Sequence, residues 1–263
     1  MMSRILQLSN NKKVHYIESG QGEPTVFIHG VGMQALAWQP QLTFFSKNYH
    51  VISVDMPGHG KSDGLQEGST LTDFVTWGIE VIEKLALGPV NLVGHSMGSL
   101  ITLGVSVTRP DLVKRMAVLN SVYKRSSKEK KAILKRVAEL ESGYMDTISP
   151  IQRWFNGTKN TKLAYKVKSW LEEMKASEYL IAYSAFAHGD NVYADNWKEV
   201  RCPSLILTGE QDLNSSADMA TQMADNAKFG KAVIIKNEKH MVNLTAPRLV
   251  NKAISQWLQT SIH

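Results

Sequence analysis

The chain has 263 residues, of which 43% are hydrophobic and 21% are charged, a composition typical of a globular protein with a packed core. Its net charge is +6 at neutral pH, but no nucleic-acid-binding module or aromatic platform accompanies the basic residues, so no nucleic-acid partner is expected. No apolar run is long enough to cross a bilayer, no signal peptide is recognised, and the single cysteine excludes an internal disulfide, so we expect a cytoplasmic protein without membrane contact.

Apolar segments with strand character alternate with helical segments along most of the chain. Parallel strands need long crossover connections, which are usually helices. The alternation therefore predicts an α/β fold with a mostly parallel, twisted sheet flanked by helices. Strands are predicted over residues 4–8, 14–17, 25–28, 50–54, 90–93, 115–119, 204–208 and 232–235, and helices over 71–87 and 249–258.

The middle of the chain lacks this alternation. Ile133, Val137 and Leu140 recur there at helical spacing, and no β period is visible. The pattern predicts a core made of residues 1–121 and 196–263, with a helical lid inserted over residues 122–195. The basic residues at the start of the insertion, from Lys124 to Arg136, are interpreted as a solvated helix face, with attraction of anionic substrates as the alternative.

Ser96 is the first candidate for catalysis. It lies in the motif Gly94-His95-Ser96-Met97-Gly98, directly after a predicted strand and before a helix. A G-x-S-x-G motif in this context is typical of a sharp turn that exposes the serine hydroxyl. A free hydroxyl is a poor nucleophile, so this serine needs a histidine to accept its proton.

Four segments together resemble the α/β-hydrolase superfamily, and the resemblance extends over nearly the whole chain. They are the serine motif, His29 to Gly32, Asp55 to Ser62, and the late pair formed by Gly209 to Asp212 and His240. The segments Arg153 to Phe155 and Ser177 to Tyr183 further resemble the lid of 3-oxoadipate enol-lactonases and related carboxylesterases. The resemblance implies a serine hydrolase.

The roles of the remaining residues follow from this comparison and from the predicted strand ends. His240 is expected to act as the general base, and Asp212 to orient it, with Glu210 as the competing acid. The backbone N–H groups of Val31 and Met97 are expected to form the oxyanion hole. Met97 directly follows the nucleophile, and Val31 lies in the His-Gly turn.

The expected substrate is a small carboxylic ester or lactone, cleaved through an acyl-serine intermediate. Met33 and Trp38 near the oxyanion turn, and Trp154 and Arg153 in the lid, are the candidate substrate-binding residues. Arg153 is expected to pair with a substrate carboxylate or with a lid acid such as Asp146 or Glu173.

Two other functions stay open at this point. A C–C bond hydrolase or a perhydrolase would use the same triad, and a ligand receptor would keep the fold with little or no turnover. No cofactor is expected, and no metal, because metal-binding histidine and cysteine spacings are absent. Of the other histidines, His95 is predicted to point away from the cleft, and His15 and His50 to lie at the surface.

Overall fold

The computed structural model describes residues 1–155 and 161–262, and its strands form an eight-stranded sheet with the order β1-β2-β4-β3-β5-β6-β7-β8. The pairs β1/β2 and β2/β4 are antiparallel, and the other neighbours are parallel. The predicted fold class is confirmed. The strands are β1 (Met2–Gln7), β2 (Lys13–Ser19), β3 (Glu23–Ile28), β4 (Tyr49–Val54), β5 (Val90–His95), β6 (Val113–Leu119), β7 (Ser204–Gly209) and β8 (Gly230–Ile235).

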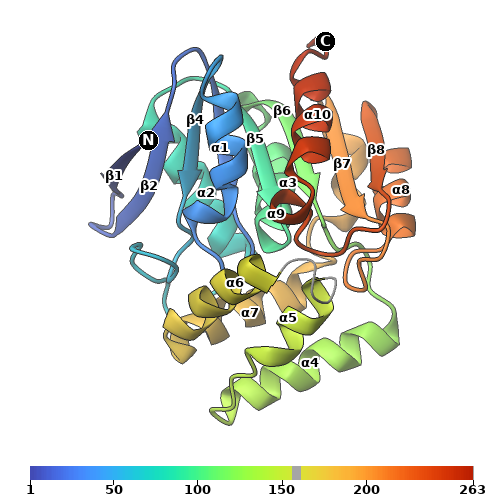
Figure 1. The fold of residues 1–263 in the computed structure, drawn as a ribbon. Coiled ribbons are helices and arrows are strands. Elements are labelled where there is room, and N and C mark those ends of the chain that lie inside the picture. Colours follow the sequence, from blue (N-terminus) through green and yellow to red (C-terminus); the bar gives the residue numbers. More distant parts are fainter. Residues whose placement is uncertain (156–160, 263) are drawn as a thin grey trace.

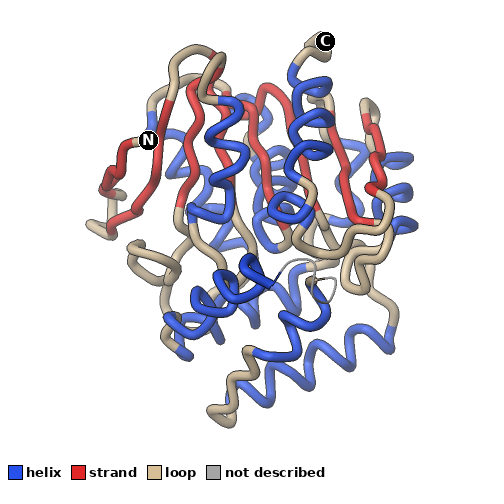
Figure 2. The backbone as a smooth tube through the Cα atoms, viewed as in Figure 1, coloured by secondary structure: helices blue, strands red, loops and turns tan. Residues whose placement is uncertain are grey.

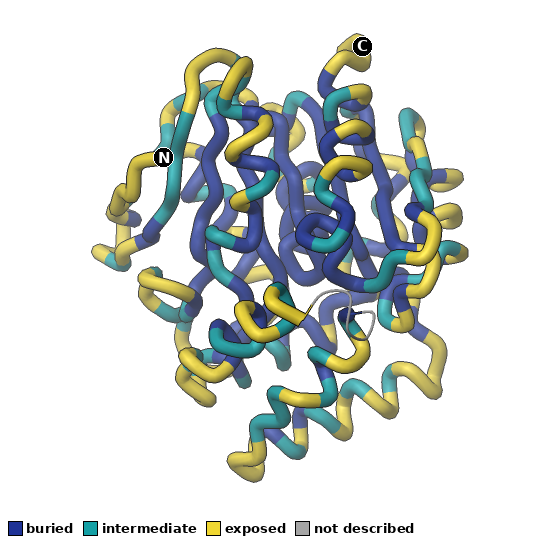
Figure 3. Tube along the Cα trace, viewed as in Figure 1, coloured by how far each residue is buried: buried dark blue, intermediate teal, exposed yellow. Residues whose placement is uncertain are grey.

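Helices cover both faces of this sheet, as Figures 1 and 2 show. One face packs against α1 (Gln39–Phe45), α9 (Val242–Thr245) and α10 (Pro247–Leu258), and the other against α2 (Leu71–Leu85), α3 (Met97–Thr108) and α8 (Ala217–Asn226). Because helices cover both faces of the sheet, β5 and β7 are buried along their whole length. Strands buried in this way have nearly continuous apolar sequences. The edge strand β1 is exposed (Figure 3).

The predicted insertion contains four helices in the described residues, α4 (Ser127–Glu141), α5 (Ile148–Trp154), α6 (Thr161–Glu173) and α7 (Ala176–Gly189). They follow β6 and precede β7, and they lie beyond the C-terminal ends of the parallel strands (Figure 1). Residues 156–160 of the insertion lie outside the described residues. The described residues also contain the short 3-10 turns η1 (Ala35–Trp38), η2 (Pro110–Leu112) and η4 (Ala194–Glu199).

The structure differs from the sequence prediction mainly at element ends. Helix α2 ends at Leu85 rather than at residue 87, because Ala86 adopts a left-handed conformation that stops the helix. The short helices α1 and α8 were not predicted. In the part of the chain that the structure describes, no helix is long and apolar enough to cross a membrane.

Candidate active site

Ser96 occupies a strained turn between β5 and α3. Its φ of 54° lies in a region that residues with a side chain rarely adopt. Its backbone N–H donates to the carbonyl oxygen of Leu119 at 2.9 Å, which fixes the turn to the neighbouring strand. A side chain at Gly94 would collide with the Gly98 carbonyl, so the turn cannot form without glycine at this position.

His240 and Asp212 come from two separate loops and form a buried hydrogen-bonded pair. The Nδ1–H of His240 donates to Oδ2 of Asp212 at 2.7 Å. The side chain of Asn120 donates to the same oxygen at 2.8 Å, and the backbone N–H of Asn214 donates to the other oxygen at 2.8 Å. Burial alone would raise the pKa of Asp212, but His240 and these donors hold it below its ordinary value. The carboxylate therefore stays ionised.

The competing acid, Glu210, lies elsewhere. It is exposed, and its carboxylate accepts the backbone N–H of Asn237 at 3.0 Å. The structure thus places Asp212, not Glu210, against the imidazole.

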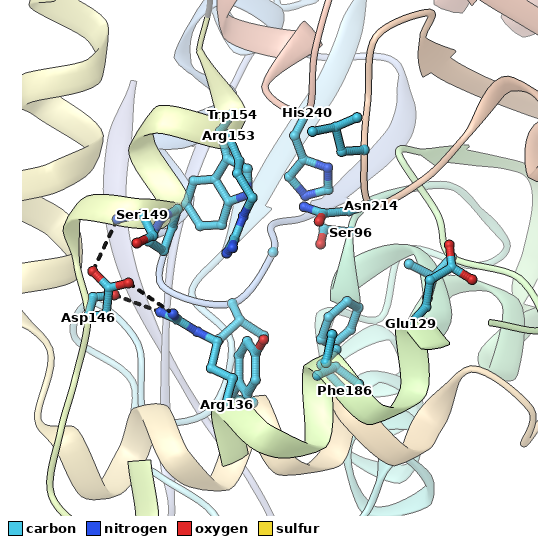
Figure 4. Close-up of a pocket in the computed structure, with 18 of the residues that line it drawn as sticks. Ser96, Glu129, Arg136, Asp146, Ser149, Arg153, Trp154, Phe186, Asn214 and His240 are labelled. Atoms are coloured by element: carbon cyan, nitrogen blue, oxygen red, sulfur yellow. Dashed lines mark hydrogen bonds and ion pairs between the residues drawn. The ribbon is translucent and has the colours of Figure 1, made fainter. Parts of the chain in front are cut away.

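Ser96 and His240 face a common cavity of about 540 Å³, which we call the Ser96 cavity. It lies between the strand ends and the inserted helices, and Figure 4 shows Ser96, His240 and Arg153 around the same space. Of the predicted substrate-binding residues, Met33, Arg153 and Trp154 line it.

The expected oxyanion donors lie on either side of Ser96. Val31 lines the cavity next to Gly30, and a Cβ at Gly30 would approach the Cβ of Ser96 to 2.9 Å. Met97 begins α3, so its N–H belongs to the first helical turn, where N–H groups lack an intrahelical partner. Both positions suit a donor to an oxyanion held at Ser96.

Trp38 does not line the cavity, and the prediction that it binds substrate is wrong. It is fully buried, and its ring lies 5.1 Å from the ring of Phe27 in the core on the face of the sheet covered by α1 and α10. The turn η1 carries it away from the oxyanion loop, although Met33, only five positions earlier, does reach the cavity.

One histidine prediction also needs correction. His95 borders the Ser96 cavity, but it is only 2% exposed, and its ring lies against Trp38 and bonds the backbone of His240. His15 is not at the surface but is 6% exposed, with its Nδ1 2.7 Å from Oδ2 of Asp55.

The His15–Asp55 pair also contacts a serine, because Nε2 of His15 lies 2.8 Å from Oγ of Ser3. The three residues form a second Ser–His–Asp series. Its setting differs from that of Ser96. Ser3 is exposed on the edge strand β1, outside any strained turn, and it does not line the Ser96 cavity. Asp55 also accepts the backbone N–H groups of Ala35 and Lys61, as expected of a structural hub.

Two buried histidines anchor the loop that carries Val31. Nε2 of His59 accepts the N–H of Gly32 at 3.0 Å, and Nε2 of His29 accepts the N–H of Met56 at 3.0 Å. Both rings must be neutral to accept in this way. Burial lowers the pKa of His59 to about 3 and also lowers the pKa of His29.

We expect the free energy of unfolding to decrease as the pH falls from 7 to 5. Burial lowers the pKa values of His59 and His95 to about 3 in the folded protein, whereas an unfolded histidine binds a proton below about 6.5. Below that pH the unfolded state binds more protons, so each histidine removes up to about 1.4 kcal/mol per pH unit. Denaturant titrations at several pH values measure this slope, which should become shallower in His59→Gln. An identical slope in that variant would contradict the account.

Three arginines reach the Ser96 cavity from the inserted segment. Arg125 and Arg136 were interpreted as part of a solvated helix face, but their side chains are only 5% and 11% exposed. Arg125 pairs with Asp190 at 3.3 Å, and its Nη2 is buried without a hydrogen-bond partner. Arg136 pairs with Asp146. For Arg153, the described residues provide no ion-pair partner.

Trp154 makes a further contact with His240. Its indole stacks on the ring of His240, with the centroids 5.7 Å apart, and its Nε1 is buried without a partner. A buried N–H without a partner costs free energy unless a ligand satisfies it. The wall of the cavity carries three arginine side chains together with the acids Glu129, Glu139 and Asp146.

Residues 25–253 match the Alpha/beta hydrolase family, and the chain belongs to this family of hydrolases. It is 59% identical over 262 residues to the (E)-2-((N-methylformamido)methylene)succinate hydrolase of Acinetobacter baylyi, covering 99% of this chain and 100% of that protein. It is 24% identical over 252 residues to the 2-(acetamidomethylene)succinate hydrolase of Mesorhizobium japonicum, covering 92% and 90% of the two chains.

The fold is also shared with solved structures. The enol-lactonase of Burkholderia xenovorans LB400 superposes with a TM-score of 0.87 at 18% identity, covering 98% of this chain and 100% of that one. At this identity the likeness concerns the fold alone.

Proposed function

We propose that this chain hydrolyses an N-acylated enamine that carries two carboxylates, with Ser96 as nucleophile, His240 as general base and Asp212 orienting the base. The observation that carries the proposal is that Arg125, Arg136 and Arg153 line the same cavity as Ser96. The 59% identical relative is named for a substrate of this class, a methylene succinate with an N-methylformamido group.

The charges of the cavity suit such a dianion. Arg153 has no acidic partner among the described residues and faces the open space (Figure 4), so it is available to a substrate carboxylate. Arg125 is held by Asp190, with its Nη2 buried without a hydrogen-bond partner, and Arg136 is held in place by Asp146. Arginine residues fixed by neighbouring acids are preorganised to bind a planar carboxylate.

The chemistry follows from the geometry around Ser96. Its Oγ attacks the formyl carbon while His240 accepts the hydroxyl proton, and the N–H groups of Val31 and Met97 hold the oxyanion. The tetrahedral intermediate then breaks its bond to nitrogen, and His240 returns the proton to the departing enamine. Water attacks the formyl-serine next, releasing formate and restoring Ser96. The free enamine hydrolyses in water to an aldehyde and methylamine.

The bond proposed to be cleaved differs from the ester bond predicted from the sequence. The name of the 59% identical relative contains an amide and neither an ester nor a lactone, so an acyl C–N bond replaces the ester bond in the leading hypothesis. Ester hydrolysis uses the same acyl-serine steps, and activity on simple esters is compatible with the triad. A C–C bond hydrolase remains the second candidate, because it would need the same base and oxyanion donors.

The test is product analysis with (E)-2-((N-methylformamido)methylene)succinate and the purified protein. We expect one equivalent of formate for each equivalent of substrate consumed. Consumption without formate would indicate cleavage of a C–C bond, with the formamide left intact. Binding without any consumption would favour the ligand receptor, and neither binding nor consumption would refute the substrate class.

Arg153→Gln should raise the KM for this dicarboxylate by about 10- to 100-fold, because a hydrogen bond to a charged group contributes about 1.5–3 kcal/mol. Its effect on kcat should be smaller, since the carboxylate is bound in both the ground state and the transition state. Initial rates over a range of substrate concentrations separate the two constants. Arg201→Gln, which removes an exposed arginine outside the Ser96 cavity, is the matched control. If both variants showed the same KM, Arg153 would have no part in binding.

We further propose that residues 122–195 act as a lid over the cavity. The described helices of this segment supply its arginines and Trp154, and Nζ of Lys239 donates to the carbonyl of Phe155 at 3.2 Å, which joins the segment to the loop of His240. A small-molecule partner, the absence of nucleic-acid and membrane partners, and a cytoplasmic location stay predictions.

A further inference from the structure

His95 connects the nucleophile turn to the base. The Nε2–H of its ring donates to the backbone carbonyl oxygen of His240 at 2.9 Å, across 145 positions in sequence. Because a carbonyl oxygen can only accept, the ring must carry its proton on Nε2. The two imidazole rings lie 5.0 Å apart.

Residues 236–241 form the loop that carries His240, between β8 and α9. Several bonds hold the neighbours of His240 in this loop. The N–H of Gln211 donates to the Glu238 carbonyl at 2.8 Å, the N–H of Asn237 donates to Glu210 at 3.0 Å, and Nζ of Lys239 donates to the Phe155 carbonyl at 3.2 Å. The bond from His95 acts on His240 itself, and it starts from the residue next to Ser96.

The surroundings of His95 keep it from acting as a second base. It is 2% exposed, and its ring meets the edge of the Trp38 ring at 6.4 Å. Burial, together with the nearby His240 and His29, lowers the pKa of His95 to about 3, although Asp212 acts in the opposite direction. Its Nε2–H is already used by the His240 carbonyl.

We propose that His95 is a positioning residue for hydrolysis: its Nε2–H bond to the His240 carbonyl sets the imidazole at the distance from Ser96 that proton transfer requires. The bond fixes the backbone of the base relative to the nucleophile turn, while Asp212 fixes the orientation of its ring. General-base catalysis depends on such geometry within a few tenths of an ångström. The inference rests on the triad of the proposed function but not on the proposed substrate.

The test compares His95→Gln with His95→Met. The two side chains have similar length and shape, and the Nε2 of glutamine lies as many bonds from Cα as the Nε2 of histidine, so only glutamine can donate to the His240 carbonyl. Lost packing should affect both variants alike. Two rates are measured: kcat on the dicarboxylate, and the rate at which an uncharged fluorophosphonate modifies Ser96, which needs the triad but not the arginines.

His95→Met should lower both rates by about tenfold, the effect of one lost hydrogen bond at a catalytic distance, with KM nearly unchanged. His95→Gln should recover most of this loss. Equal rates in the two variants would overturn the proposal. If wild type reacted with the fluorophosphonate but did not turn over the dicarboxylate, the proposed substrate would fail while this inference remained. An absence of modification in wild type would refute the triad itself.

A measurement on the wild-type protein covers the case in which a variant does not fold. The ring of His95 should appear in nitrogen NMR as the neutral Nε2–H tautomer, and it should remain so at pH 5. A neutral Nδ1–H tautomer, or protonation already at pH 6, would contradict the bond on which the proposal depends.

Discussion

Ser96→Ala is expected to lower kcat by about 10⁴-fold or more, because the variant has no oxygen to form the acyl-enzyme. The fold should remain intact. Ser96 is a small side chain at a cavity wall, and the turn is fixed by its backbone bond to Leu119 and by close packing at Gly94. Formate release gives the rate, and thermal unfolding of the two proteins verifies that the variant is folded.

Ser3→Ala is the matched control for this substitution. It removes the hydroxyl of the second Ser–His–Asp series, whose His–Asp distance is also 2.7 Å but whose serine does not line the Ser96 cavity. We expect wild-type turnover in this variant. Loss of activity in Ser3→Ala, with activity retained in Ser96→Ala, would transfer the chemistry to the other site.

Asp212→Asn should be nearly as severe, with a loss of about 10⁴-fold in kcat. Asn120 and the backbone N–H of Asn214 both donate to Asp212, so an amide in its place would have to turn its NH₂ group toward one of these donors or toward His240. The imidazole would then lose the acceptor that holds its Nδ1–H tautomer, and its Nε2 would no longer be free to take the proton of Ser96.

Glu210→Gln is the control, because it changes the other acid of the same loop. Its carboxylate only accepts the N–H of Asn237 at an exposed site, so kcat should remain close to that of wild type. Steady-state rates of the two variants decide between the acids. A larger loss in Glu210→Gln than in Asp212→Asn would show that the acid has been assigned to the wrong residue.

Much of the site could be predicted because each of its residues lies in a recognisable local sequence pattern. The turn at Ser96 needs glycine on both sides of it, and these residues form a recognisable motif after an apolar strand. Asp212 and His240 follow the ends of late strands, and parallel strands bring their C-terminal ends to one edge of the sheet. The order of the segments was therefore enough to predict that the three residues lie at one edge of the sheet.

The contacts that could not be predicted join residues far apart in the chain. Nothing local indicates that His95 bonds a carbonyl 145 positions away, or that η1 turns Trp38 into the core while Met33 reaches the cavity. Arg125 and Arg136 lie in a run of charged residues that is typical of a solvated helix. Only the packing of α4 against α7, and the acids Asp190 and Asp146, place these two arginines inside.

The proposed substrate class differs most from the one predicted from the sequence, for the same reason. A sequence that contains a serine motif indicates acyl transfer, but the bond that is cleaved depends on which groups line the cavity. Three arginines in the wall of the Ser96 cavity favour an anionic substrate, and this property arises from the tertiary arrangement of the inserted segment.

The most direct test is to locate the covalent adduct that an uncharged fluorophosphonate forms on the wild-type protein. Peptide mass spectrometry should place a single phosphonyl group on Ser96, with concurrent loss of formate release. An adduct on Ser3, or continued turnover with Ser96 fully modified, would contradict the claim that the Ser96 hydroxyl attacks the substrate.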